Sequence, residues 1–568
     1  MRFHFAAIVG ALSLSACGDG RTAVESELLQ LVPEDAGIVA VSADWGDIRS
    51  RAEDNHWVRL FSGATWQDLA AMVREVFQAE EELDLLGALA STEGEAVAYA
   101  KFPGEPLLSE LGVVVQTTGA AEDFEAFWLR FSAFVDRKGT SEVSQHAGAQ
   151  VCVVTHNMET VLFRSGSLHG MTISPAAGRA LAAAKGILDR HAGNASSSIV
   201  DAPHFREARA DRVGDSALRV FVDGPALFSL IRGYTDDGEI ELLDQLGITS
   251  MRWAVADMDL GNGERFDLAV AAHLPEDSPM GSMLSHFGPV PKRFAQAVPE
   301  DAMQVVLGNI EPLPTFQAFR DFLLQVSPVD DERLQREIEE VQQEMGLDLE
   351  EDLLAPLTGR FAAMGIPVPH SGDQQMEVWM GPYPPFASLA FTFAPTVGIE
   401  LREDQAADRA LRAIEKLARK DPNFAQVNLA GVEVNLVQGE FLFAPHWGKY
   451  DSLVFFSIMD ASIRSSLDFL ASRSRRSFAS KPGISQVLSE FRSASLLVLT
   501  RTGLLVDMGL GMMRVYGQNS GNAQGRDELP LGSIRWPHLM RAVDLFKGVS
   551  VLALTRGADR IELRLSAR

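Results

Sequence analysis

The chain alternates between short segments with apolar residues at every second position and longer segments with apolar residues at helical spacing. The first spacing predicts strands, because successive side chains of a strand point to opposite faces. Such segments in the first half are Ile38–Ser42, Ala96–Lys101, Gly112–Thr117, Ala149–Thr155 and Leu218–Val222. Helices are predicted at Trp66–Phe77, Ala121–Val135 and Pro175–Leu188. Short turns between neighbouring strands favour a largely antiparallel sheet with helices packed on one face, in the α+β class.

The same landmarks occur twice, in the same order. The segment Leu31-Val32-Pro33-Glu34-Asp35-Ala36 and the strand after it recur as Ala297-Val298-Pro299-Glu300-Asp301-Ala302 and a second strand. The strand segment that begins Ala147-Gly148 recurs as the one that begins Ala430-Gly431. We therefore expect a tandem duplication, with a first α+β repeat over residues 28–290 and a second over residues 291–568. The second copy carries an insert at about 367–385, where the first has only the short link Phe102–Pro106.

The N-terminal residues predict an export signal. Arg2 is followed by the apolar run Phe5–Leu14 and by the box Leu14-Ser15-Ala16-Cys17. The apolar run is too short to span a bilayer, and small residues before the cysteine are typical of a cleavage site. The box resembles that of bacterial lipoproteins, which implies cleavage before Cys17 and acylation of that residue. The alternative is an ordinary secretory signal with a coincidental cysteine.

The lipoprotein resemblance implies a signal peptide over residues 1–16, then a lipid anchor and short tether over residues 17–27. Two or more acyl chains hold a protein stably on a membrane. The expected location is the bacterial cell envelope, facing the periplasm, with the membrane as a partner through lipidated Cys17. Gly18, rather than an aspartate, follows the cysteine. By resemblance to enterobacterial sorting, this favours the outer membrane over the inner one.

The charge balance argues against a nucleic-acid partner, and the cysteine count argues against an intrachain disulfide. The chain has 50 Lys and Arg residues against 77 Asp and Glu residues, a formal net charge of −27. Phosphate backbones repel so acidic a protein, so no nucleic-acid partner is expected. With Cys17 acylated, only Cys152 remains, which leaves no intrachain disulfide. Cys152 lies in an apolar strand segment and is predicted to be a buried, inert thiol.

Two short motifs resemble a known family. They are the Pro33-Glu34-Asp35-Ala36 opening with its strand, and the later strand Gly94-Glu95-Ala96-Val97-Ala98-Tyr99-Ala100. In an exported chain, they resemble domain of unknown function 3352, which occurs in bacterial exported proteins. The resemblance extends as a pattern over both halves. It implies a fold and supplies no catalytic residues.

The sequence shows no arrangement that is typical of catalysis. It has no Walker motif, no His-Glu-x-x-His and no Cys-x-x-Cys, so no enzyme, cofactor or metal site is expected. Two groups of residues lack metal-ligand spacing. The first is interpreted as a solvated hairpin and contains Asp257, Asp259 and Glu264. The second is interpreted as scattered surface or strand-end histidines and contains His146, His156 and His169. The acidic segment Asp330–Glu351 predicts an amphipathic helix. Its expected inward residues are Leu334, Ile338, Val341 and Met345.

The insert of the second copy contains the candidate binding residues. Trp379, Met380, Tyr383 and Phe386 lie in a proline-rich stretch, and exposed aromatic and Met side chains are typical of protein interfaces. Alternatively, the insert caps the sheet with a small core of its own. The preferred hypothesis is a non-catalytic envelope lipoprotein that binds a protein or scaffolds an assembly.

The alternative hypothesis is a carrier or binder of a hydrophobic, lipid-like ligand. It predicts apolar side chains on strand faces that no helix covers. An enzyme would instead show convergent polar residues in a cleft, retained in one copy and lost in the other.

Overall fold

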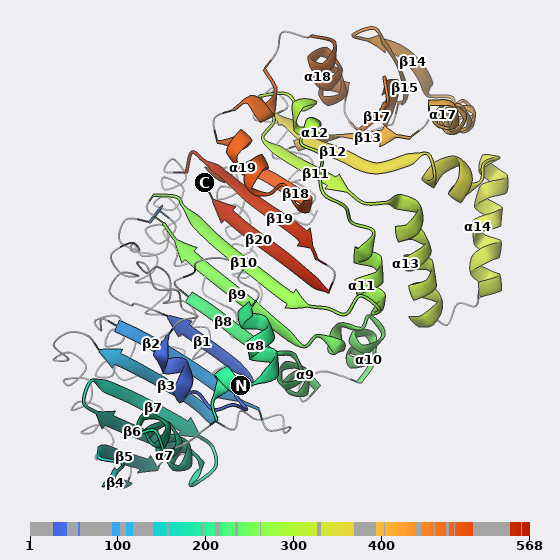
Figure 1. Cartoon of the computed structure of the whole chain (residues 1–568). Helices are drawn as coiled ribbons and strands as arrows, with labels where there is room; N and C mark the ends of the chain where they lie inside the picture. Colours follow the sequence, from blue (N-terminus) through green and yellow to red (C-terminus); the bar gives the residue numbers. More distant parts are fainter. Residues whose placement is uncertain are drawn as a thin grey trace, which may run out of the picture. The chain divides into compact units, whose positions relative to one another are not determined.

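Figure 1 shows a computed structural model of the chain. The described residues are 26–42, 51, 55–56, 94–102, 110–117, 140–155, 158–194, 197–210, 216, 218–232, 237–261, 263–326, 331–367, 393–402, 404–438, 445–458, 460–472, 476–481, 483–503, 546–557 and 559–567. Cys17, with the signal peptide, and the predicted helices Trp66–Phe77 and Ala121–Val135 lie outside this set. No helix among the described residues combines the length and the apolar character that a membrane span requires.

The chain divides into two compact units. The first comprises Met1–Pro275 with Ser533–Arg535, and the second comprises Glu276–Gly532 with Trp536–Arg568. Each has a large antiparallel sheet and several helices, as expected for a mixed α+β protein.

Strands β1 to β10 of the first unit pair in the order β4-β5-β6-β7-β3-β2-β1-β8-β9-β10, and every pairing is antiparallel. The strands are β1 (Ile38–Ser42), β2 (Gly94–Lys101), β3 (Glu110–Thr117), β4 (Thr140–His146), β5 (Ala149–Thr155), β6 (Glu159–Ser165), β7 (Leu168–Ser174), β8 (Leu218–Asp223), β9 (Trp253–Leu260) and β10 (Phe266–His273). The described helical segments are η2 (Glu27–Leu31), α7 (Arg179–His191), η3 (Ile199–Asp201), α8 (Pro203–Ala210), α9 (Gly224–Arg232), α10 (Asp237–Gln245) and η4 (Ile248–Ser250).

The main core of the first unit lies on one face of its sheet. Val39 and Val41 on β1 and Tyr99 on β2 are buried in this core, because alternate residues of a strand share a face. Helix α7 packs on the same face over β6 and β7, where it buries Ile187 and Leu188 (Figure 1). Full burial of one such side chain stabilises the fold by about 1.5–3 kcal/mol. This packing fixes the position of the last turn of α7.

In the second unit, strands β11 to β20 pair in the order β14-β15-β16-β17-β13-β12-β11-β18-β19-β20, again antiparallel throughout. The strands are β11 (Gln304–Asn309), β12 (Leu357–Pro367), β13 (Phe393–Leu401), β14 (Phe424–Leu429), β15 (Val432–Val437), β16 (His446–Tyr450), β17 (Leu453–Ser457), β18 (Ala494–Arg501), β19 (Val549–Arg556) and β20 (Arg560–Ala567). The described helical segments are α11 (Pro279–Ser285), α12 (Arg293–Gln296), α13 (Pro312–Val326), α14 (Asp331–Met345), η5 (Leu349–Leu354), α17 (Asp404–Ala418), α18 (Asp460–Ala471), η6 (Phe478–Ser480) and α19 (Ile484–Glu490).

Helices pack on both faces of the second sheet, so the prediction of helices on one face is wrong for this unit. Helices α12, α18 and α19 contribute to the main core, together with Phe455 of β17. The neighbouring Val454 points to the opposite face, where it packs with Leu411 of α17. On β16, Lys449 pairs with Asp408 of the same helix at 2.9 Å. An amphipathic helix such as α17 has one apolar stripe whichever face of the sheet it covers. The sequence pattern therefore did not show on which face it packs.

One hairpin turn has the same form in both units. Ala147 and Gly148, between β4 and β5, have φ angles of 49° and 80°. Ala430 and Gly431, between β14 and β15, have φ angles of 53° and 84°. Two-residue turns with positive φ at both positions match the twist of the flanking strands, and glycine adopts that conformation at low cost. The recurring Ala-Gly pair therefore encodes the same turn twice.

The apolar alternation predicted several strands well, and it failed where little is buried. The bounds of β1 and β5 agree with the prediction, and those of β2, β3 and β8 extend it by one or two residues at an end. Strand β4 was not predicted. Its residues 142–145 are exposed, so it lacks the apolar face that the pattern detects. The amphipathic helix α14 is present, but Val341 is 51% exposed rather than facing inward.

Candidate functional site

An apolar cleft of about 480 Å³ opens in the second unit, where β11 ends and β12 begins. Helices α11 and α13 and strands β12 and β13 supply most of its lining. Among the described residues that line it, Thr315 alone has a polar side chain. The larger apolar side chains are Met283, Ile310, Phe316, Phe319, Phe361 and Ile399. The cleft suits a ligand that is itself apolar.

Two glycines allow the chain to approach closely at the base of this cleft. Gly359 has a φ of 85°, and a Cβ there would lie 2.1 Å from the carbonyl oxygen of Ile310. Its own carbonyl accepts a hydrogen bond from the Ile310 N–H at 2.9 Å. A Cβ on Gly308 would lie 2.2 Å from the ring of Phe361, so the absence of a side chain leaves room for that ring. These close contacts fix the strand ends that carry Ile310 and Phe361.

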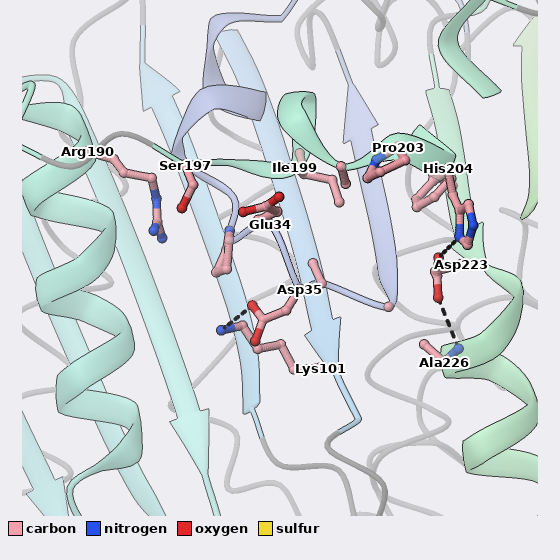
Figure 2. Close-up of a pocket in the computed structure, with 15 residues that line it drawn as sticks. Glu34, Asp35, Lys101, Arg190, Ser197, Ile199, Pro203, His204, Asp223 and Ala226 are labelled. Carbon is pink, nitrogen blue, oxygen red and sulfur yellow. Dashed lines mark hydrogen bonds and ion pairs between the residues drawn. The ribbon is translucent and has the colours of Figure 1, made fainter. Parts of the chain in front are cut away.

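A second cleft, of about 630 Å³, lies in the first unit where β1 begins and β2 and β8 end (Figure 2). The turn Pro33–Gly37 forms part of its wall. Its charged and titratable lining residues include Lys101 at the end of β2, Arg190 in the last turn of α7 and His204 in the first turn of α8. We call it the polar cleft. The sequence singled out the turn only as a repeated landmark, and gave no sign that it borders a cavity.

A charged network supports one side of the polar cleft. Lys101 Nζ lies 2.8 Å from Asp35 Oδ1 and 3.8 Å from Glu110 Oε2. The Tyr99 hydroxyl donates a hydrogen bond of 2.6 Å to Glu110 Oε1. Burial, followed by the Glu110 carboxylate, raises the pKa of Tyr99 well above its ordinary value. The phenol therefore stays protonated and holds Glu110 in place beside Lys101.

Arg190 and His204 face the polar cleft from other elements (Figure 2). Arg190 Nε donates a hydrogen bond of 2.8 Å to the carbonyl oxygen of Leu31. Burial lowers the pKa of Arg190, opposed by nearby Tyr99 and by carboxylates that include Glu110 and Asp35. His204 Nδ1 lies 2.7 Å from Asp223 Oδ1. The other oxygen of Asp223 accepts from the Ala226 N–H at 3.1 Å, so the carboxylate both orients the imidazole and caps α9.

A buried ion pair lies on the core face of the first unit, and it corrects the interpretation of Asp257 as part of a solvated hairpin. Arg219 on β8 donates hydrogen bonds of 2.6 Å from Nε and from Nη2 to the two oxygens of Asp257 on β9. Ser216 Oγ donates to Asp257 at 2.7 Å. Both members of the pair are buried. Arg219 Nη1 is buried without a hydrogen-bond partner among the described residues.

The other candidate residues do not gather into one site. His146 ends β4 and pairs with Asp189 at 2.8 Å, whereas His169 is buried on β7 rather than at the surface. His156 lies outside the described residues. Cys152 is buried, as predicted. Within the described part of the chain, no group of three or more His, Cys, Asp or Glu side chains is placed to hold a metal ion.

The insert residues Trp379, Met380, Tyr383 and Phe386, and Cys17, lie outside the described residues. Comparisons with protein-family models, with curated proteins and with solved structures find no match to this chain. The functional argument therefore rests on the two clefts.

Proposed function

We propose that this chain is a non-catalytic lipoprotein of the bacterial cell envelope whose second unit binds the apolar chain of a lipid. The apolar cleft is the observation that carries the proposal. Its volume of about 480 Å³ lies in the range of known ligand sites, and its lining is almost entirely apolar. An acylated Cys17 would hold this cleft close to a membrane, which is a source of such chains.

The exposure of Phe319 supports an apolar occupant. This side chain lines the cleft and is 42% exposed in the described structure. Covering a half-exposed aromatic ring with a ligand stabilises the complex by roughly 1–2 kcal/mol. An acyl chain needs no hydrogen-bond partners, and the cleft offers almost none.

Titration with cis-parinaric acid, a fluorescent fatty acid, tests the cleft. We expect saturable binding that Phe319→Ser weakens about five- to thirty-fold. The matched control is Leu242→Ser on α10 of the first unit, because Leu242 is 47% exposed and does not line this cleft. Absence of saturable binding, or an equal effect of the two substitutions, would contradict the proposal.

The anchor is tested separately. Cys17→Ala should leave an unacylated, uncleaved precursor, because the thiol is the proposed acylation site. Normal processing and membrane retention of that variant would rule out the lipid anchor and leave the cleft proposal standing.

A protein-binding or scaffolding role is a second proposal. Val341, exposed on α14, gives the second unit an apolar surface residue beyond the cleft, and the proposed contacts of the insert are Trp379, Met380, Tyr383 and Phe386. Capture of a defined envelope protein that depends on these residues would favour this role over lipid binding.

We also propose that the two units arose by tandem duplication and are of the domain family that the sequence motifs resemble. The identical order of strand pairing supports the duplication, as does the shared Ala-Gly turn. Gly148→Ala and Gly431→Ala test it, because equivalent turns should lose similar amounts of stability in the two units.

A further inference from the structure

The polar cleft of the first unit contains opposite charges that are not paired with each other. Glu34 and Arg190 both line it, and Figure 2 shows their charged groups facing its interior. Among the described residues, no hydrogen bond or ion pair joins these two side chains. Arg190 is held through Nε, and within the described part of the chain its two Nη nitrogens form no hydrogen bond. Beside the Lys101–Asp35 pair, the described lining thus offers Arg190, a cation anchored through Nε, and Glu34, a carboxylate without an ion pair among the described residues.

Arg190 is suited to bind a carboxylate. A guanidinium can donate two parallel hydrogen bonds to the two oxygens of one carboxylate, and such charge-assisted pairs are strong. Its backbone contact to Leu31 and its place on the packed helix α7 fix its orientation before any ligand arrives. Pre-organisation of this kind reduces the entropy lost on binding.

The surroundings disfavour a purely anionic ligand. The three carboxylates Glu34, Asp35 and Asp223 line the cleft against the two cations Lys101 and Arg190, and the whole chain has a net charge of −27. The negative charge of these carboxylates and of the whole chain opposes the approach of a free anion. A ligand with a carboxylate at one end and an ammonium group at the other has no net charge, and it satisfies Arg190 and Glu34 together.

The second unit has a different set of charged residues around the repeated Pro-Glu-Asp-Ala motif. Strand pairing shows which residues of the two units correspond. The carbonyl of Gly37 accepts a hydrogen bond from the Asp223 N–H, and the carbonyl of Met303 accepts one from the Arg501 N–H. Gly37 therefore corresponds to Met303, and Asp223 to Arg501. Burial, followed by nearby Arg501, lowers the pKa of Lys481, and nearby Glu300 and Asp301 oppose this shift. The carboxylates of the second Pro-Glu-Asp-Ala motif therefore have Lys481 near them, whereas in the first motif Asp35 is paired with Lys101.

We propose that the polar cleft binds a short zwitterionic peptide, with the Arg190 guanidinium receiving its carboxylate and the Glu34 carboxylate receiving its ammonium group. The volume of about 630 Å³ exceeds what a single amino acid fills and accommodates a di- or tripeptide. This site is independent of the apolar cleft, so either proposal can fail without the other.

Calorimetric titration of the full chain with alanyl-alanine tests the proposal. We expect saturable binding, weakened about tenfold or more for the N-acetylated dipeptide and for the dipeptide amide, each of which lacks one charge. L-Alanine and trialanine, tested alongside, distinguish a free amino acid from a peptide. The assignment is overturned if alanyl-alanine gives no binding up to about 10 mM, or if the blocked analogues bind equally well.

Variants assign each contact. Glu34→Gln should remove the preference for a free ammonium group, and because Glu34 is exposed the fold should be unaffected. Arg190→Lys keeps the charge and loses the two-pronged geometry, so the preference for the free carboxylate over the amide should fall. Glu300→Gln, in the second unit, is the matched control and should change neither. Unaltered selectivity in Glu34→Gln, or equal effects of Glu34→Gln and Glu300→Gln, would exclude the proposed binding mode.

Discussion

The two units combine the same order of strand pairing with different chemistry at the strand ends. In the first unit, a polar cleft lies where β1 begins and β2 ends; in the second, an apolar cleft lies where β11 ends and β12 begins. Ile38 pairs with Val222 as Gln304 pairs with Thr500, so β1 corresponds to β11 and the two clefts lie at opposite ends of the equivalent strands. The central strands carry the shared fold, and their ends are free to differ because little of the core depends on them.

The difference extends to single positions. In this register Asp223 of the polar cleft corresponds to Arg501. After the short helices η3 and η6, the sequence Ala202-Pro203-His204 corresponds to Lys481-Pro482-Gly483. The His204–Asp223 pair therefore has no counterpart in the second unit. The first unit has an imidazole–carboxylate pair at this point, whereas the second unit has Arg501 and Lys481 at the corresponding positions.

The largest expected effect comes from the buried Arg219–Asp257 pair, whose corresponding residues in the second unit are Leu497 and Ala553. Asp257→Ala alone should destabilise the first unit by about 3–5 kcal/mol, because it leaves a buried guanidinium unpaired. The double substitution Arg219→Leu with Asp257→Ala copies the second unit and should restore stability to within about 1 kcal/mol of the natural protein.

Hydrogen exchange of the β8 and β9 amides measures this effect within one unit. Arg232→Leu is the control, since Arg232 and Asp244 form an exposed pair at 3.6 Å and its loss should cost less than about 1 kcal/mol. If the double variant is as unstable as Asp257→Ala, the two sheets do not tolerate the same residues at this position. The structural equivalence of β8 and β9 with β18 and β19 would then be contradicted.

Tyr99 gives the next largest effect. In the second unit Met364, a buried apolar residue, stands at the corresponding position. Tyr99→Phe removes the hydrogen bond to buried Glu110 and should cost about 1.5–3 kcal/mol near neutral pH.

The same variant predicts a pH dependence. The folded-state pKa of Tyr99 is raised above that of the unfolded chain, chiefly by burial. Its contribution is therefore fully present below about pH 10 and is lost as the pH rises toward the folded-state pKa. Between about pH 9 and pH 11, the free energy of unfolding should fall more steeply for the natural protein than for Tyr99→Phe. Equal slopes in denaturant titrations would show that the phenol is not buried as described.

The Ala-Gly turns should respond alike in both units. Gly148→Ala and Gly431→Ala force a side chain into a left-handed conformation, at a cost of about 1–2 kcal/mol each. No atom lies within 4 Å of the added Cβ at either position, so backbone strain alone is measured. Gly238→Ala, in α10, is the control and should be neutral or slightly stabilising. If hydrogen exchange shows unequal losses of stability in the two hairpins, the case for duplication is weaker.

The sequence predicted most central strands because burial imposes a period of two on their residues, whereas it marked the Ala-Gly turns only as a repeated landmark. It missed β4, whose exposed residues have no such period, and it missed Arg219–Asp257, because two charged residues in separate strands give no sign that they face each other in a core. The sequence did not indicate either cleft. Glu34, Arg190 and His204 come from a turn and two helices that meet only in the fold, and the Pro-Glu-Asp-Ala motif is present in both units although the polar cleft is described in one.

The smallest expected effect concerns the connection between β12 and β13, which is about three times as long as that between β2 and β3. Replacing Pro369–Pro384 with a short Gly/Ser link gives the second unit a connection like that of the first. A threefold change in loop length alters the closure entropy by only roughly 1 kcal/mol, so the melting temperature should change little if the insert serves a partner. Binding of cis-parinaric acid should also persist, because the described lining of the apolar cleft comes from other segments.

Loss of a protein partner with an unchanged melting temperature would assign Trp379 and Tyr383 to recognition. A large drop in melting temperature would instead show that these aromatic residues stabilise the second unit, and the two units would then differ in their cores as well as at their strand ends.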